Sequence, residues 1–362
     1  CKEMSTQLKN EEFVLFTRPS GQSDIKSAWK LQSCLMPIIT KDNEFILETL
    51  FVSVDPYLSS GLKKSALGGA INSIGSIQIS GLVARVIESR NPNIPVDTIV
   101  TGRMEWKRFI LANGTEPRFR IVQKPTDKNT IYNKIGFSTA VGVLGMPSQT
   151  SYYGILSVAN TQPSDVLVIS GAAGAVGTIA GQIAKKIRGA KMVIGIAGGK
   201  KKCDCIVNEL GFDAAIDYKE YNTKDKMVNR LKELTPSGIT QYFDNTGGFV
   251  TDAIFDIIER HSKIIICGQI STYNNSEEDL SKSNIYPNYL AKTIYRGLSI
   301  LGFVCSDFIH RNEEEFFKDM PNWLEQGIIK FHETIIDGFE NLPRAYEMLF
   351  TGENIGKIVV KV

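Results

Sequence analysis

Residues 166–186, VLVISGAAGAVGTIAGQIAKK, decide the fold. A short apolar run leads into the glycine turn Ala172-x-Gly174-x-x-Gly177, and a segment with helical spacing follows. Small residues let the turn tighten and let its backbone approach a pyrophosphate, whose charge sits at the N-terminus of the next helix. Strand, turn and helix in this order are the context that the dinucleotide-binding fingerprint requires. The stretch therefore predicts a dinucleotide site.

Three lysines follow this turn, in the sequence GGKKK at residues 198–202. About twenty residues past the turn, an NAD-binding protein carries an acid that holds the ribose 2′-hydroxyl. That acid would repel a 2′-phosphate, whereas lysine ammonium groups attract one. We therefore expect NADP(H) as the cofactor, with Lys202 in direct contact and Lys200 and Lys201 adding to the positive field.

The chain beyond about residue 165 alternates short apolar runs with segments of helical spacing. The expected strands are 166–170, 192–196, 214–217, 239–243, 264–267 and 298–304. The expected helices are 176–186, 203–210, 227–234, 250–258 and 288–295. Such alternation needs crossover connections and predicts an α/β domain with a mostly parallel sheet.

The first third of the chain is instead rich in β-branched and apolar runs separated by Pro, Asn and Gly. The tail carries an amphipathic segment at 343–350 and a final strand at 357–362, which we expect to complete this first domain. The expected division is residues 1–135 with 316–362 for the β-rich domain and 136–315 for the dinucleotide-binding domain.

Composition narrows the class of protein. A net charge of +2 over 362 residues gives no reason to expect nucleic-acid binding. The six cysteines are scattered without the spacing of a zinc lobe or a disulfide framework, which favours a reducing compartment. Residues 166–184 carry no charge, but their glycines and their setting indicate a buried turn unit and no membrane span. Because the visible start lacks a signal-peptide pattern, we expect a cytoplasmic protein.

Ligands of open α/β sheets bind beyond the carboxyl ends of the strands. Polar and aromatic residues gather at those ends here: 171–177, Lys202, Tyr218, Asn245, the loop GQISTYN with Tyr273, and 303–304. The histidines, in contrast, number three and lie in the last third, at His261, His310 and His332. They fit no catalytic zinc ligand set, so we expect each to be an ordinary residue and no metal to be bound.

These motifs together resemble the zinc-independent medium-chain dehydrogenase/reductases, and within them the prostaglandin reductase and alkenal double-bond reductase group. The matching stretches are SVDPYL (53–58), LGMP (144–147), SGAAGAVG (170–177), GQIAK (181–185), GFDAAIDYK (211–219), YFDNTGG (242–248), CGQISTYN (267–274), GFVCSDF (302–308) and GENIGK (352–357). Nine motifs in the family's order make a specific resemblance.

The resemblance implies a GroES-like β-rich domain and a Rossmann doubly wound parallel-sheet domain. It implies a homodimer that uses NADPH to reduce the carbon–carbon double bond of α,β-unsaturated ketones or aldehydes, of the 15-oxoprostaglandin 13-reductase or 2-alkenal reductase type. The implied substrate residues are Tyr57, which lines the pocket, and Tyr273, which steadies the substrate carbonyl. The implied cofactor residues are Gly174, Ala175, Val176, Gly177, Lys202, Tyr218, Asn245, Cys267, Gly268, Gln269, Ile270, Ser271, Phe303, Val304 and Asn354.

Conjugate reduction asks less of a protein than direct carbonyl reduction does. A hydride adds to the β-carbon and charge develops on the enolate oxygen, where a hydroxyl donor such as Tyr273 can stabilise it. A proton then reaches the α-carbon, which we expect to come from water.

The sequence departs from its relatives mainly around the substrate. Leu82 replaces a pocket tyrosine of plant members, and Ser148 and Gln149 replace glycine and an apolar residue. Two alternatives stay open. One is an NADPH quinone reductase, and the other is a crystallin-like protein that binds NADPH without turnover.

Overall fold

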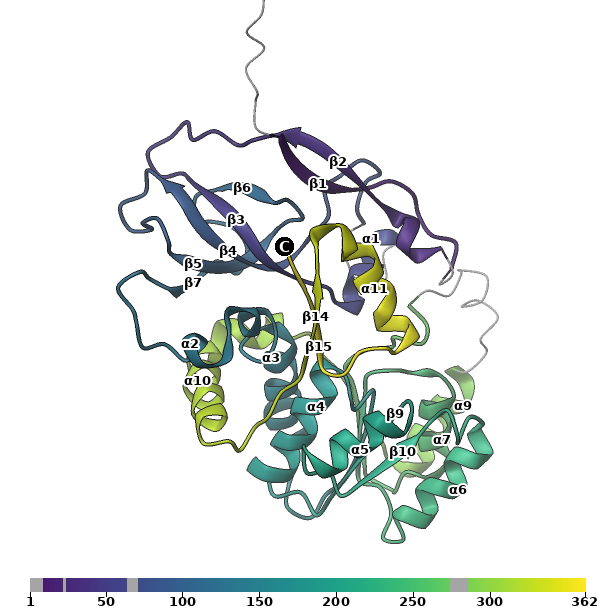
Figure 1. Ribbon diagram of the computed structural model, residues 1–362. Coiled ribbons are helices and arrows are strands. Elements are labelled where there is room, and N and C mark those ends of the chain that lie inside the picture. The colour runs from purple at the N-terminus through teal and green to yellow at the C-terminus, as the bar shows by residue number, and fades with distance from the viewer. Residues whose placement is uncertain (1–8, 22–23, 64–70, 274–285) are drawn as a thin grey trace, which may run out of the picture. The chain divides into compact units, whose positions relative to one another are not determined.

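The computed structural model describes residues 9–21, 24–63, 71–273 and 286–362 of the chain (Figure 1). The chain forms two compact units. The first comprises Cys1–Gly142, Thr334–Glu353 and Ile358–Val362, and the second comprises Val143–Glu333 and Asn354–Lys357. Within the described residues, no helix is both long and apolar enough to cross a membrane.

The first unit is built on a seven-stranded sheet. Its strands run in the order β14 (Glu333–Asp337), β15 (Lys357–Lys361), β3 (Phe45–Ser53), β4 (Ile79–Ser89), β5 (Ile99–Glu105) and β7 (Arg120–Gln123), and β6 (Phe109–Ala112) also pairs with β3. Strands β1 (Lys9–Leu15) and β2 (Trp29–Leu35) form a separate antiparallel pair. Strand β15 runs antiparallel to β3 and places Val359 opposite Ser53.

Aromatic side chains fill the core of the first unit. Trp106 and Tyr346 are fully buried, and the Trp29 ring lies 5.3 Å from the first and 5.0 Å from the second, between centroids. Tyr346 comes from α11 (Leu342–Thr351), whose apolar side faces this core. Shorter helical segments complete the unit: η1 (Ile25–Ala28), η2 (Pro56–Leu58), α1 (Ser59–Leu62), α2 (Tyr132–Ile135), η3 (Phe137–Val141) and η6 (Phe339–Asn341).

The second unit is built on a six-stranded parallel sheet. The strand order is β10 (Ala214–Asp217), β9 (Met192–Ala197), β8 (Val166–Ser170), β11 (Gln241–Asp244), β12 (Lys263–Ile266) and β13 (Ser299–Gly302). This is the Rossmann order, in which the direction of winding reverses between β8 and β11. The reversal makes the carboxyl ends of β8 and β11 the expected ligand position.

Helices precede, connect and follow these strands. They are α3 (Met146–Tyr153), η4 (Gly154–Ala159), α4 (Ala175–Gln182), η5 (Ile183–Ile187), α5 (Lys200–Asn208), α6 (Lys224–Leu234), α7 (Gly248–Ile257), α9 (Tyr286–Arg296) and α10 (Ser306–Glu325). Apolar residues of α6 and α7 form one buried cluster with the sheet residues Val168, Ile194 and Ile264. The α/β organisation predicted from strand–helix alternation is confirmed.

The compact units differ from the expected division in three places. The first unit extends beyond residue 135 to Gly142. The second unit extends beyond residue 315 to Glu333, because α10 packs on α3: the Tyr152 hydroxyl donates to Asp319 at 2.7 Å and the Tyr152 ring meets Phe316 edge-on. Residues Asn354–Lys357 also belong to the second unit, although the strand that follows them pairs in the first. The helix α10 was not among the helices expected from the sequence, and helical periodicity would not have said which core it covers.

Candidate functional site

In the glycine turn after β8, position 177 has room only for glycine. A Cβ on Gly177 would lie 2.4 Å from the carbonyl oxygen of Gly171, which has a positive φ of 60°. The backbone therefore folds back on itself more tightly than a side chain would allow. Gly174 caps α4 without any side-chain hydrogen bond, so the first backbone N–H groups of that helix are open to an anion.

The tail of the chain lies against this turn. The N–H of Gly356 donates to the carbonyl of Ala173 at 2.8 Å, and Gly356 forms a parallel bridge with Gly174. Asn354 is buried, and its amide donates to the carbonyl of Gly356 at 2.9 Å. The structure thus brings Asn354 to the segment that touches the glycine turn, as its proposed role would require.

Lys202 lies in the first turn of α5, and Lys219 follows the end of β10. Burial, and then the charge of Lys219, lower the pKa of Lys202. The Tyr218 ring covers Gly198, where a Cβ would lie 2.8 Å from a ring carbon. The positive charge of Lys219 thus disfavours the charged form of Lys202, and a bound anion would relieve this repulsion. Lys219 was missed by the sequence reasoning, although it follows Tyr218 directly.

Two carboxylates lie near the lysines and reduce the positive field expected from Lys200. Lys200 pairs with Asp204 one turn along the same helix, so much of its charge is balanced locally. Asp217, at the end of β10, accepts hydrogen bonds from the N–H groups of Gly199 at 2.8 Å and Lys219 at 2.9 Å. This carboxylate shapes the backbone beside the lysines.

A buried carboxylate organises the point where the strand order reverses. Asp244 ends β11, is fully buried and accepts five hydrogen bonds. The donors are the hydroxyls of Ser170 (3.0 Å), Tyr242 (3.0 Å) and Thr251 (2.7 Å) and the N–H groups of Thr246 (2.9 Å) and Gly247 (2.8 Å). This network satisfies the charge of Asp244 inside the protein. Asp244 lies within the motif YFDNTGG, but nothing in its sequence context indicates this role.

Asn245 is fixed by the same network. Its N–H donates to the Ser170 hydroxyl at 2.9 Å, and its side-chain amide donates to the Ser170 carbonyl at 2.7 Å. The Ser170 and Asn245 contact joins the carboxyl ends of β8 and β11. Asn245 therefore stands at the predicted ligand position with its amide oxygen free of these bonds.

The loop after β12, residues 267–273, folds over that position. The N–H groups of Cys267 and Gly268 donate to the Asp244 carbonyl at 2.9 and 3.0 Å, and that of Ser271 donates to Thr246 at 3.0 Å. Burial raises the pKa of the Cys267 thiol, so this cysteine is neutral. The predicted residues Gln269 and Ile270 lie in the same loop.

Tyr273 ends the described part of this loop. Its hydroxyl oxygen accepts a hydrogen bond from the N–H of Gln269 at 3.1 Å. Burial raises the pKa of Tyr273, so the side chain is a neutral phenol near pH 7. Because its oxygen already accepts one bond, its proton is left to donate to another acceptor.

The other residues singled out in the sequence lie after β13, in the first unit or in α3. The Phe303 ring meets Phe243 with centroids 6.3 Å apart, and Val304 is 59% exposed. Tyr57 belongs to the first unit, where the Arg103 guanidinium lies over its ring at 5.7 Å. Leu82 is fully buried in β4. Ser148 and Gln149 are buried in α3.

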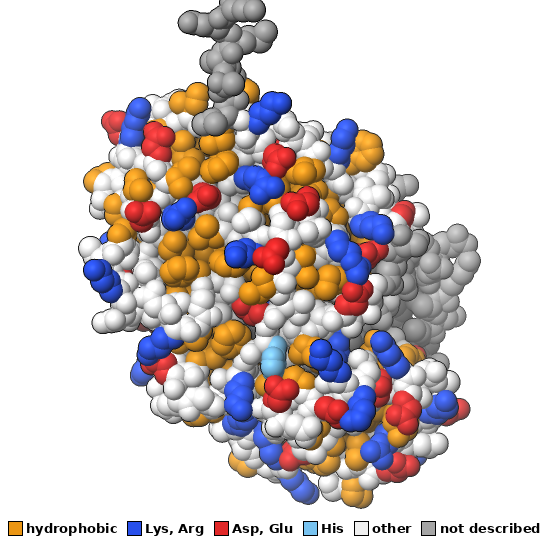
Figure 2. All heavy atoms as spheres, in the orientation of Figure 1, with side chains coloured by type: hydrophobic (Ala, Val, Ile, Leu, Met, Phe, Trp, Pro, Cys, Tyr) orange, Lys and Arg blue, Asp and Glu red, His pale blue; other side chains and the backbone are white. Residues whose placement is uncertain are grey.

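Charged side chains and histidines also lie away from the ends of β8 and β11. On the face shown in Figure 2, basic and acidic side chains are interspersed over the described residues. His261 has a positive φ of 61° beside Gly297, and the side chain of His310 lies outside the described residues. His332 contacts Cys205 and Glu209.

Comparison with known proteins places the chain among oxidoreductases. Residues 11–119 match the family described as "N-terminal domain of oxidoreductase", and residues 175–325 match "Zinc-binding dehydrogenase". The chain is 35% identical to the putative NADP-dependent oxidoreductase YfmJ of Bacillus subtilis and 33% identical to prostaglandin reductase 1 of Sus scrofa, in both cases over 97% of each chain. It matches the crystal structure of CurA from Vibrio vulnificus in complex with NADPH with a TM-score of 0.84 and 30% identity, over 97% of this chain and 99% of that one.

Proposed function

The chain belongs to the zinc-independent medium-chain dehydrogenase/reductases of the prostaglandin reductase group, and from that premise we propose that it reduces the carbon–carbon double bond of α,β-unsaturated ketones and aldehydes with NADPH. It is an NADP(H)-dependent oxidoreductase. Prostaglandins, lipid-derived alkenals and aryl enones are the candidate substrates.

One observation carries the proposal beyond the family. Tyr273 presents a neutral phenol whose oxygen accepts the Gln269 N–H, on a loop bound to the turn that holds Asn245. A donor of this kind suits an enolate oxygen, which gains charge only as the double bond is reduced.

The cofactor residues are proposed in the same way. The open N–H groups at the start of α4 suit the pyrophosphate, and Lys202 with Tyr218 and Lys219 suits the 2′-phosphate. NADPH, when bound, supplies the hydride. Asn245 would orient the nicotinamide half and Asn354 would approach from the tail, while Tyr57 would line the substrate pocket.

The reaction class is tested by following NADPH oxidation with 4-hydroxynonenal, 15-oxoprostaglandin, an aryl enone and a quinone, with NADH as a control. We expect turnover of the enones with NADPH preferred. Oxidation by the quinone alone would instead assign the chain to the quinone reductases.

Tyr273→Phe tests the proposed donor. Loss of one oxyanion donor costs about 100-fold or more in kcat, so we expect a loss of this size for enones while NADPH still binds. Tyr295→Phe is the matched control, because that side chain is 76% exposed on α9 and should leave kcat unchanged. Equal kcat for Tyr273→Phe and the unaltered enzyme would remove Tyr273 from the mechanism.

We also propose that the protein is a homodimer and that it is cytoplasmic. Strand β13 ends the sheet order of the second unit, and its Ile300 is 42% exposed. An exposed apolar edge strand favours pairing with another chain, which supports a homodimer. Light scattering of the unaltered protein and of Ile300→Lys would test this. The five described cysteines form no disulfide with one another, which suits the cytoplasmic location that we propose.

A further inference from the structure

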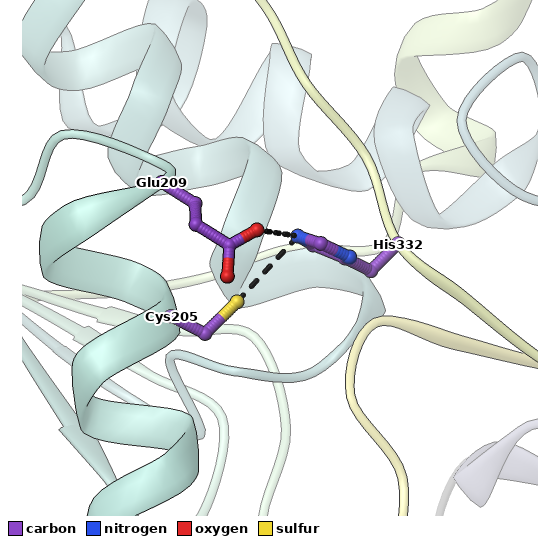
Figure 3. Close-up of side chains that lie close together, drawn as sticks. All are labelled: Cys205, Glu209 and His332. Atoms are coloured by element: carbon purple, nitrogen blue, oxygen red, sulfur yellow. Dashed lines mark hydrogen bonds and ion pairs between the residues drawn. The ribbon is translucent and has the colours of Figure 1, made fainter.

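We propose that Cys205, Glu209 and His332 form a zinc-binding site. Cys205 lies on α5 and Glu209 directly follows its end, four residues on and therefore on the same side of the helix. His332 comes from the segment that leads into β14, and its ring points at both side chains (Figure 3). Among the described residues, these three form the group of potential metal ligands with atoms within 4.8 Å of one another.

The distances match those between ligands of a tetrahedral zinc ion. Zinc bonds of about 2.3 Å to sulfur, about 2.05 Å to nitrogen and about 2.1 Å to oxygen place sulfur about 3.6 Å from nitrogen, and nitrogen about 3.4 Å from oxygen. The Cys205 Sγ lies 3.5 Å from the His332 Nε2, and that nitrogen lies 3.3 Å from the Glu209 Oε2. Two edges of the tetrahedron are therefore already formed. The third pair, the Cys205 Sγ and a Glu209 carboxylate oxygen, lies within 4.8 Å, and the Glu209 side chain is 54% exposed and so has room to adjust.

The ligand chemistry favours zinc over other common cations. Thiolate and imidazole suit Zn²⁺, whereas Mg²⁺ and Ca²⁺ require oxygen ligands. When zinc binds, the Cys205 thiol releases its proton to solvent as the zinc–sulfur bond forms. The thiolate and the Glu209 carboxylate then balance the two positive charges, and neutral His332 is the third ligand. Cys205 is buried, while the Glu209 and His332 side chains are partly exposed, so water can reach the fourth position.

The site would fasten two segments that carry cofactor residues. Helix α5 carries Lys202 in its first turn, and the His332 carbonyl accepts the N–H of Lys357 at 3.0 Å. Lys357 follows Gly356, whose N–H binds the glycine turn. A zinc ion would therefore tie α5 to the segment that touches the turn, at a place separate from Tyr273. The predicted role is structural.

Cobalt substitution tests the proposal without relying on activity. Tag-free full-length protein, treated with a chelator and dialysed, is titrated with Co²⁺ in the absence of NADPH. We expect one equivalent to bind, with a sulfur-to-cobalt charge-transfer band and the intense visible bands of tetrahedral cobalt, and we expect Zn²⁺ to displace it. Zinc should also raise the melting temperature of the unaltered protein.

Single substitutions identify the ligands. Changing even an outer partner of a zinc site costs up to about 100-fold in affinity, so loss of a ligand should cost at least that much. We expect this loss for Cys205→Ser, His332→Gln and the exposed Glu209→Gln, which should fold normally. Cys203→Ser, two residues away on the same helix, should keep both the band and the affinity.

Three outcomes would overturn the proposal: no stoichiometric binding of Co²⁺ or Zn²⁺, binding without the sulfur band, or equal loss of the band in Cys203→Ser.

Discussion

Two regions at the carboxyl edge of the same sheet hold charge in opposite ways. Beyond β8 and β11, the buried Asp244 carboxylate accepts five internal hydrogen bonds and the neighbouring Asn245 is fixed by two more. Beyond β9 and β10, Lys202 and Lys219 repel each other. The hydrogen bonds of the first region are satisfied internally, whereas the second is the region that we propose to bind an anion.

The difference separates positioning from recognition. A satisfied buried network sets the geometry of a site before any ligand arrives, because moving one member leaves the others without partners. Two like charges that repel each other raise the energy of the free protein. A bound phosphate relieves this repulsion, and the relief adds to the affinity for the phosphate. Substitutions in the two regions should therefore fail in different ways.

The largest effect is expected from Asp244→Asn. The change removes the negative charge that accepts hydrogen bonds from five donors, and it places an amide N–H₂ group, itself a donor, towards some of them. We expect the free energy of unfolding to fall by about 3 kcal/mol or more. Urea unfolding followed by circular dichroism measures the loss. Asp204→Asn, on the surface of α5, is the control and should leave the midpoint unchanged. Equal midpoints for the two variants would contradict the assigned role of Asp244.

Lys202→Ala should leave stability nearly unchanged and weaken cofactor recognition. A hydrogen bond to a charged group contributes about 1.5–3 kcal/mol, so the KM for NADPH should rise about 10–100-fold. The KM for NADH should not change. Lys200→Ala is the matched control, since Lys200 is paired with Asp204. Steady-state kinetics with both cofactors measures this, and a similar rise for Lys200→Ala would show that only the general field matters.

The smallest effect is expected in the pH dependence of the same region. Burial and Lys219 lower the pKa of Lys202, so its charge is lost at a lower pH than that of a free lysine. The KM for NADPH should therefore rise as the pH becomes alkaline, while the KM for NADH stays flat. Lys219→Ala removes the repulsion and should move this rise to higher pH. A rise that stays at the same pH in Lys219→Ala would mean that Lys219 does not act on Lys202.

Local patterns predicted much of this arrangement. The strands 166–170 and 214–217 coincide with β8 and β10, because short apolar runs bounded by turn residues have few alternatives. The glycine turn was also readable, since its spacing reflects a close backbone approach. The residues proposed for the site follow from strand ends and from the resemblance, and their roles stay predictions.

Partnerships between distant segments could not be predicted in this way. Nothing near Asp244 in the sequence says that Ser170 will donate to it, and nothing near Cys205 points to His332. The packing of α10 on Tyr152 is of the same kind, because periodicity gives a buried face without its partner. Lys219 could have been predicted, since it directly follows Tyr218, which the resemblance implies for the 2′-phosphate.

The late position of the segment that touches the glycine turn has a consequence for biosynthesis. Gly356 and the strand β15 are synthesised long after their partners, because the first contacts Ala173 and the second pairs with β3. Neither unit can reach its final pairing until these residues have left the ribosome, because a closing segment of each is missing before then. A chain that stops short of this segment should therefore be a target for proteolysis, even though nearly all of both sheets has been synthesised.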